Sequence, residues 1–264
     1  MNTFTFETLS DSAKNISSYY GLRIATTPTD HNGETEFEEY DVPGRVMKLT
    51  RSLGQMASTT REYDVSFPAV GNTEAERRAY LHSNLRNIKS WLMSSTAWTK
   101  LSDTYDPDIF YKARCNSDME FTLLRDEVAQ GKITFTVDPR KFLNSGNAYY
   151  RISNGSYIDN PGMTSYPILL IPCTAANATC RVTTTIDGQL KTYLISFPNA
   201  AGLTFEIDCE SMSVYRVDGN SYSAGGAYMS RLSEFPKLGP GRSTFILSGV
   251  SATGTKIMPR WWQP

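Results

Sequence analysis

Residues 181–197, RVTTTIDGQLKTYLISF, contain the strongest fold signal in the chain. Two runs rich in β-branched and aromatic residues, Arg181–Ile186 and Thr192–Phe197, flank the pair Asp187-Gly188. An Asp-Gly pair between such runs predicts a β-hairpin, because its tight turn needs positive φ angles that these residue types tolerate. We therefore predict two antiparallel strands joined by a short turn.

Further strand-like runs surround this hairpin. They are Ile168–Ile171, Thr204–Asp208 and Ser213–Arg216, and clusters of turn residues separate them. A spacing of about 8–12 residues between short strands is typical of a β-sandwich. We predict a β-sandwich domain over residues 141–264.

The first half of the chain also contains strand-like runs. Tyr20–Ile24 and Tyr63–Phe67 alternate apolar and polar residues, as half-buried strands do. Phe121–Val137 predicts a second hairpin, with Ala129–Lys132 as its turn and alternate residues from Ile133 onward on one buried face. These runs predict a sheet in this half of the chain.

One segment, Asn72–Met93, has the period of a helix. Its apolar residues recur at i, i+4, i+7 and i+11, at Leu81, Leu85, Ile88 and Leu92. Thr73 and Glu76 have the spacing of a capping box at its start. A looser stretch, Lys141–Asn147, indicates a connector. The predicted class is mostly β (α+β): a β-rich domain with one long helix over residues 1–140, then the sandwich.

Composition excludes several function classes. The chain has 264 residues with 26 basic and 27 acidic side chains, and its net charge of −1 argues against a nucleic-acid-binding protein. The N-terminus lacks a signal-peptide pattern, and the longest apolar run, Ile168–Ile171, is far too short to span a membrane. We expect a soluble cytosolic product with no membrane contact, in which the four cysteines are free thiols, buried or half-buried. A disulfide between Cys173 and Cys180 across a short loop is the less favoured alternative.

The residues give no catalytic, cofactor or metal site. Only two histidines are present; His31 lies in a turn-like segment and His82 at the edge of the helix's apolar face. One acidic cluster contains Asp103, Asp106 and Asp108. Because a proline interrupts it, the cluster predicts a turn rather than a calcium-binding loop. Trp261-Trp262 could stack on a sugar, but a terminal pair of this kind more often packs one ring inward.

Several motifs occur together in a specific order along the chain. They are YDVPGR (Tyr40–Arg45), YDVSF (Tyr63–Phe67), IKSWL (Ile88–Leu92), LSD (Leu101–Asp103), YDPDIFYKAR (Tyr105–Arg114), FTVDP (Phe135–Pro139), NPGMTSYPI (Asn160–Ile168) and IMPRW (Ile257–Trp261). The first six resemble the N-terminal domain of distal tail proteins (Dit) of siphophages and prophages of Gram-positive hosts. The last two resemble the galectin-like sandwich that follows it.

This resemblance implies a structural protein of the virion tail tip, assembled in the host bacterial cytoplasm. It implies a homohexameric ring in which residues 1–140 form a belt and residues 141–264 form outer galectin-like domains. One face would meet the tail-tube protein and the other the tail-associated hub or lysin protein, with receptor-binding or baseplate proteins at the periphery. DNA would pass through the channel without specific binding, which the weak net charge fits.

The ring interface is predicted at two segments, chosen from the resemblance and from their expected exposure. The candidate residues are Asp41, Pro43, Gly44, Arg45, Tyr105, Asp106, Tyr111 and Arg114. Two alternatives remain: a carbohydrate-binding module that recognises host cell-wall sugar, and a wall hydrolase, for which no acid, base or metal ligand can be identified.

Overall fold

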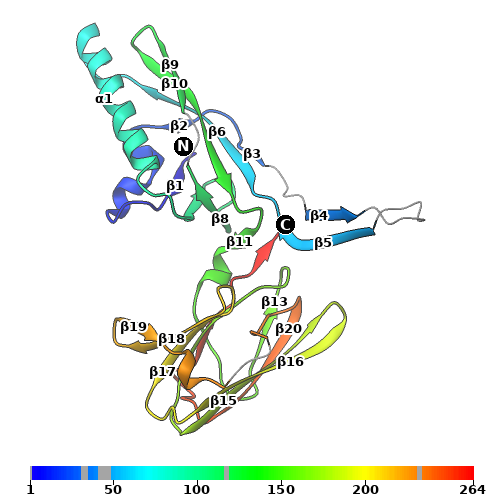
Figure 1. Ribbon diagram of the computed structural model, residues 1–264. Coiled ribbons are helices and arrows are strands. Elements are labelled where there is room, and N and C mark those ends of the chain that lie inside the picture. The colour runs from blue at the N-terminus through cyan, green and yellow to red at the C-terminus, as the bar shows by residue number, and fades with distance from the viewer. Residues whose placement is uncertain (1, 31–34, 41–48, 116–118, 231–233) are drawn as a thin grey trace. The chain divides into compact units, whose positions relative to one another are not determined.

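The computed structural model describes residues 2–30, 35–40, 49–115, 119–230 and 234–264 (Figure 1). The chain divides into two compact units, Met1–Lys141 together with Pro264, and Phe142–Gln263. Each unit has its own buried core.

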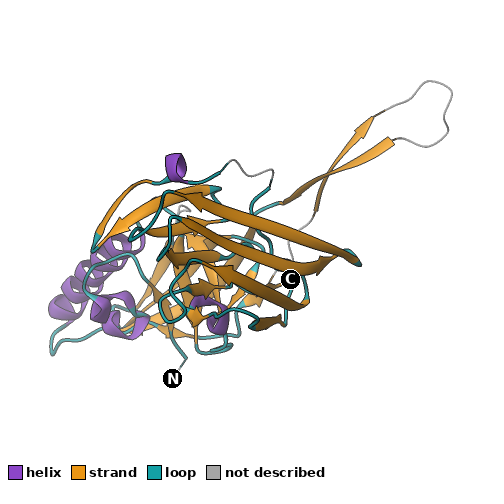
Figure 2. Cartoon of the chain, turned by 90° about the horizontal axis from the view of Figure 1, so that it is seen from below, coloured by secondary structure: helices purple, strands orange, loops and turns teal. Residues whose placement is uncertain are grey.

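Antiparallel strands and one long helix make up the first unit. Its elements are β1 (Phe4–Phe6), η1 (Ser12–Asn15), η2 (Ser17–Tyr20), β2 (Arg23–Ile24), β3 (Thr29–Asp30), β4 (Thr35–Tyr40), β5 (Leu49–Met56), β6 (Thr59–Pro68), α1 (Glu74–Leu92), β7 (Thr99–Asp103), β8 (Ile109–Arg114), β9 (Glu120–Leu124) and β10 (Val128–Val137). The main sheet has the order β1-β7-β8-β10-β6-β2, with β3 also paired to β6 and β9 to β10. Among the described strands, β4 and β5 pair only with each other, and they extend away from the rest of this unit on the side opposite α1 (Figure 2).

Helix α1 begins and packs as its sequence predicts. Thr73 is the N-cap, and its hydroxyl accepts the N–H of Glu76, whose carboxylate in turn accepts the N–H of Thr73. The buried side chains of α1 include Leu81, Ile88 and Trp91. The Trp91 ring stacks on Phe4 from β1 at 5.7 Å and on Tyr20 from η2 at 4.8 Å, so aromatic contacts join the helix to the sheet.

The hairpin over Phe121–Val137 forms, but its predicted turn at Ala129–Lys132 is wrong. The turn lies at Arg125 and Asp126, which adopt φ angles of 49° and 54°. Gly131 lies inside β10 opposite Phe121, where an added Cβ would be 2.3 Å from the Glu120 carbonyl oxygen. This glycine therefore permits close approach of two strands rather than a change of direction.

Two other local predictions need correction. The Tyr20–Ile24 run is not one strand, because η2 ends at Tyr20, Gly21 caps it with a left-handed φ of 69°, and only Arg23–Ile24 forms a strand. The predicted connector Lys141–Asn147 is also structured, and it consists of β11 (Lys141–Leu143) and η3 (Asn144–Asn147).

Two antiparallel sheets around one apolar core make up the second unit. The remaining elements are β12 (Tyr150–Arg151), β13 (Tyr157–Asn160), β14 (Ile168–Pro172), β15 (Asn177–Ile186), β16 (Gln189–Pro198), β17 (Thr204–Asp208), β18 (Ser213–Asp218), β19 (Ser221–Ala224), η4 (Gly226–Tyr228), β20 (Gly241–Ser248), β21 (Lys256–Met258) and β22 (Trp262–Gln263). The two sheets have the orders β12-β21-β14-β17-β18-β19 and β13-β20-β15-β16. β11, near the start of the second unit, pairs with β22, near its end.

The hairpin predicted around Asp187-Gly188 is confirmed. β15 and β16 pair along their whole lengths, and Asp187 and Gly188 form the turn with φ angles of 52° and 74°. Along β15 the side chains alternate inward and outward, which places Cys180 and Val182 in the core. Across that core, Phe197 stacks on Phe205 of the other sheet at 4.4 Å.

Candidate interaction surfaces

The turn between β7 and β8 is organised by the Asp103 carboxylate. Its Oδ1 accepts the backbone N–H groups of Tyr105 and Asp106 at 3.0 and 3.3 Å. Its Oδ2 accepts hydrogen bonds from Arg61 Nη2 and the Tyr63 hydroxyl, both at 2.7 Å. The predicted turn is confirmed, and Asp103 is occupied as its anchor.

A buried cation lies at the centre of this network. Arg61 on β6 is 5% exposed, and its guanidinium donates to the Tyr111 hydroxyl at 3.0 Å while lying 4.6 Å from the centre of that ring. Burial alone would lower the pKa of Arg61, but Tyr63, Asp103 and Tyr111 outweigh it and hold the pKa above its ordinary value. Burial raises the pKa of Tyr63 well above its ordinary value. The cluster is thus a buried ion pair between Arg61 and Asp103, surrounded by two tyrosines, inside the first unit.

The predicted interface residues differ in their accessibility. Tyr111 was expected to be exposed, and this is wrong: it is 4% exposed because its ring covers Arg61. Asp106 is exposed, and Tyr105 is half-buried with its hydroxyl 3.3 Å from the Thr26 carbonyl oxygen. Arg114 lies 4.3 Å from the ring of the exposed Trp98. The other four candidates lie outside the described residues, and they are Asp41, Pro43, Gly44 and Arg45. His31 also lies outside them.

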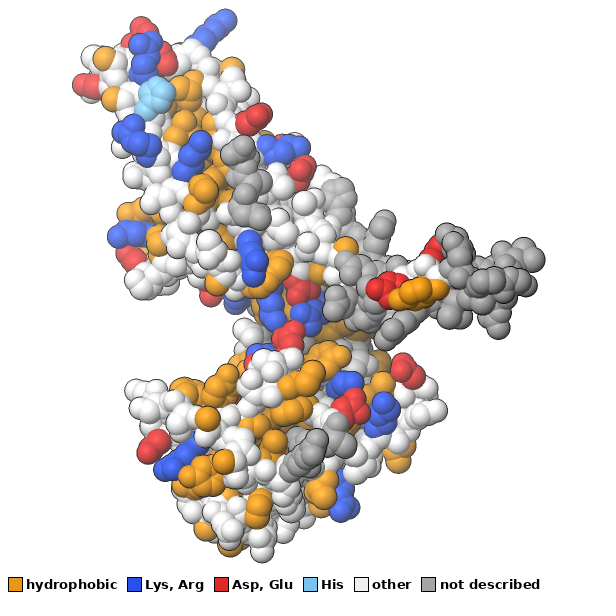
Figure 3. Space-filling model, in the orientation of Figure 1, with side chains coloured by type: hydrophobic (Ala, Val, Ile, Leu, Met, Phe, Trp, Pro, Cys, Tyr) orange, Lys and Arg blue, Asp and Glu red, His pale blue; other side chains and the backbone are white. Residues whose placement is uncertain are grey.

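A groove of about 600 Å³ lies between α1 and β9. It is lined from the helix by His82, Leu85, Arg86 and Lys89, and from the strand side by residues 119–122. Figure 3 shows apolar side chains in this region, flanked by basic side chains and by the one described histidine. Sequence reasoning missed this groove, because the periodicity of the helix does not show which strand lies beside it.

Three tyrosines gather around Glu206 on the outward face of the β17–β19 sheet. The hydroxyls of Tyr149 and Tyr222 lie 3.3 and 3.4 Å from the Glu206 carboxylate, and Tyr215 is its cross-strand neighbour. Burial, with the neighbouring Glu206 charge, raises the pKa of Tyr149 to about 12. The rings are partly exposed, so this face presents aromatic surface beside a carboxylate.

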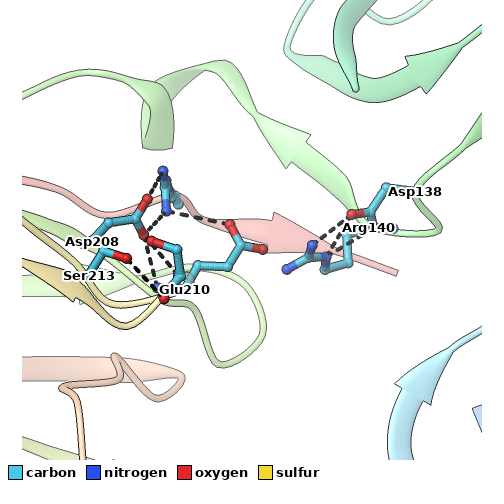
Figure 4. Close-up of polar contacts among 7 residues, drawn as sticks. Asp138, Arg140, Asp208, Glu210 and Ser213 are labelled. Carbon is cyan, nitrogen blue, oxygen red and sulfur yellow. Dashed lines mark hydrogen bonds and ion pairs between the residues drawn. The ribbon is translucent and has the colours of Figure 1, made fainter. Parts of the chain in front are cut away.

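Two arginine–aspartate pairs hold loop ends (Figure 4). In the second unit, Arg260 donates to both Asp208 oxygens at 2.7 and 3.1 Å and reaches Glu210 at 3.4 Å. Burial opposes the Asp208 charge, but the Arg260 hydrogen bonds prevail and hold its pKa below the ordinary value. In the first unit, Arg140 forms a similar pair with Asp138, with contacts of 2.6 and 2.9 Å. In both pairs the arginine donates to both carboxylate oxygens of the aspartate, and this geometry holds the loop in place.

The terminal tryptophans follow the packing prediction. Trp261 is buried, with its ring 5.7 Å from Tyr150, and Trp262 donates its indole N–H to the Thr164 carbonyl oxygen at 2.9 Å. The pair therefore does not form a flat exposed platform.

The four cysteines are free and buried, as predicted. Among the described residues no group of His, Cys, Asp and Glu could hold a metal ion. Within the same part of the chain, no helix has the length and apolar character needed to cross a membrane.

No family model matches the chain, and no curated protein matches it in sequence. Solved structures do match. The Dit protein of phage SPP1, presented as a paradigm of the hub adsorption apparatus in phages that infect Gram-positive bacteria, superposes with a TM-score of 0.66 over 97% of both chains at 10% identity. Chains of the phage p2 baseplate in its activated conformation, with strontium or with calcium, give TM-scores of 0.54 and 0.53 at 12% identity, again over 97% of both chains. The resemblance to distal tail proteins that the motifs predicted is confirmed as a likeness of fold through both units.

Proposed function

We propose that this chain is a structural distal tail protein of a phage. In this proposal it forms a hexameric ring that links the tail tube to the baseplate or tail-tip hub and docks host-recognition proteins. The observation that carries the proposal is the end-to-end match to SPP1 Dit, because it includes both units in the same order over 97% of each chain. A match to a single common β-sandwich would carry far less weight, since that architecture serves many functions.

The units take different roles in this proposal. Residues 1–140 form the belt around the channel, and residues 141–264 form the outer, galectin-like domain. The partners are further copies of the chain, the tail-tube protein, the hub or lysin protein and peripheral receptor-binding or baseplate proteins, all in the virion tail tip. The role is structural rather than enzymatic. A net charge of −1 is compatible with DNA transit, because a strongly basic channel would retain phosphates.

The ring contact is proposed at the β7–β8 turn and at the Asp41–Arg45 segment. A closed ring needs two different surfaces that meet head to tail. The β7–β8 turn supplies an exposed carboxylate at Asp106 and a half-buried aromatic ring at Tyr105 on a rigid base. Tyr111 supports that base from inside, since it holds Arg61.

The decisive experiment is the native mass of the full chain, measured by light scattering over a concentration series and followed by electron microscopy. We expect a species of six times the 29.5 kDa chain mass and ring-shaped particles with a central channel. A chain that stays monomeric at all concentrations, and forms no ring when mixed with tail-tube protein, would contradict the proposal.

One observation favours carbohydrate binding as a second candidate function. The Tyr149, Tyr215 and Tyr222 rings beside Glu206 resemble the mixture of aromatic faces and hydrogen-bonding groups that binds sugars. Binding of full-length protein to host cell-wall glycan, lost on Tyr222→Ala but not on Tyr157→Ala, would support it. Equal binding by both variants would exclude this face.

A further inference from the structure

The groove between α1 and β9 is bordered by the edge of a strand. In the described part of the chain β9 pairs only with β10, so one of its two hydrogen-bonding edges is unpaired. Residues 119–122 line the groove, and the last three of them belong to β9. Neighbouring side chains of a strand point to opposite faces, so a run of consecutive lining residues places the strand's edge along the groove.

The groove has an apolar floor and a basic rim. Leu85, Met119 and Phe121 are buried or half-buried in it. Arg86 and Lys89 are exposed on α1, and their side chains form no ion pair with any described residue.

The β9–β10 hairpin is tied to α1 about one helical turn before the residues that line the groove. Arg78 on α1 donates to Asp126 in the β9–β10 turn at 2.6 Å, which fastens the hairpin to the helix. Further along the same helix face, His82, Arg86 and Lys89 line the groove, and the lining contains a single carboxylate, that of Glu120. Arg78 thus has an acidic partner in Asp126, whereas the three basic side chains that line the groove have only the Glu120 carboxylate among the lining residues.

We propose that this groove binds an extended acidic segment of another protein, which adds to β9 as a further strand. Backbone hydrogen bonds would satisfy the free edge of β9, as in other strand additions. Acidic side chains on one face of the added strand would lie against Arg86, Lys89 and His82, and apolar side chains would contact Leu85 and Phe121. The inference goes beyond the proposed ring and does not depend on it.

The test uses the full chain and a labelled synthetic peptide of alternating Glu and Val, with a Lys-Val peptide as the matched probe. We expect fluorescence anisotropy at low salt to show binding of the Glu peptide only, weakened by added salt. The double variant Arg86→Glu/Lys89→Glu should weaken it by about tenfold or more. The control variant Arg181→Glu/Lys256→Glu, at exposed positions of the second unit, should bind as the wild type does.

Backbone methylation separates strand addition from simple charge attraction. Peptides N-methylated at every second residue lose one hydrogen-bonding edge, so one methylated set should lose binding and the other should keep it. Equal binding of both sets, or of the Glu and Lys peptides, would overturn the proposal. If instead the peptide does not bind and Arg86→Glu/Lys89→Glu abolishes self-association of the chain, the groove is a contact between copies and a separate partner is ruled out.

Discussion

At the residue scale, the fold of the first unit depends on a charge pair that is expensive to bury. The Arg61 and Asp103 side chains are 6% and 2% exposed. Such pairs cost solvation, and geometry must compensate for that cost. Here Tyr63, Tyr111 and two backbone amides supply further hydrogen bonds to the two groups. We infer that the pair ties β6 to the end of β7 and fixes the β7–β8 turn.

The first prediction concerns this pair. Asp103→Ala should lower the free energy of unfolding by about 3–5 kcal/mol, because it leaves the Arg61 charge buried without a partner. Arg61→Met in the Asp103→Ala background should recover much of the loss, since no charge is then buried. Urea unfolding of the full double-mutant cycle measures this coupling. Additive effects of the two substitutions would show that the pair contributes no coupling.

A second residue-scale prediction concerns alkaline pH. Burial raises the pKa of the Cys180 thiol to about 12, whereas an unfolded cysteine titrates near pH 8.5, as a rough reference value. The native state keeps its proton longer, so the stabilisation is complete below the unfolded pKa and is lost as pH rises toward the folded pKa. Between about pH 9 and pH 11 the contribution of this thiol should fall by about 1.4 kcal/mol per pH unit.

The matched variant is Cys180→Ala. Urea midpoints of wild type and variant should converge as pH rises over that interval, because the variant lacks the Cys180 thiol while both proteins keep the other three. Parallel pH curves would contradict the predicted linkage. Below pH 8, thiol reagents should modify Cys180 only in unfolded protein, since the side chain is buried.

At the element scale, the successful predictions rest on local chemistry. The capping box of α1 and the Asp187-Gly188 turn each involve residues within a few positions of each other, so sequence alone displays them. The failed turn at Ala129–Lys132 depends on distant geometry. Gly131 is required because Phe121 of the neighbouring strand lies against it, and a glycine in a list of turn residues gives no sign of that.

The helix start provides the element-scale prediction. Thr73→Ala removes the hydroxyl that accepts the Glu76 N–H, and it should lower the free energy of unfolding by about 1 kcal/mol. The matched control is Thr96→Ala, an exposed threonine beyond the helix, which should leave stability unchanged. Urea denaturation followed by circular dichroism measures both. A Thr73→Ala protein as stable as the wild type would show that tertiary packing alone fixes the start of α1.

At the scale of the whole molecule, the sequence motifs predicted the likeness of fold but not the sites. The motifs are short segments, which a chain can keep while the rest of its sequence changes, and identity to SPP1 Dit is only 10%. The candidate surfaces join distant parts of the chain instead. Arg61 meets Asp103 across 42 positions and Tyr111 across 50. Periodicity within one element carries no information on such pairings, so Tyr111 was expected to be exposed although it is buried.

The last prediction concerns the proposed ring. Asp106→Arg reverses an exposed charge on the β7–β8 turn while leaving the Asp103 anchor and its backbone contacts in place. If this turn lies in the ring contact, the oligomer should dissociate at a concentration about tenfold higher or more, because a like charge facing a partner replaces a favourable one. The stability of the single chain should change little, since the side chain is solvated.

Asp218→Arg, which reverses another exposed charge in the second unit, is the control. Light scattering and urea unfolding of both variants separate assembly from folding. An unchanged oligomer for Asp106→Arg would move the contact to other residues of the first unit, while a monomeric wild type would count against the ring itself.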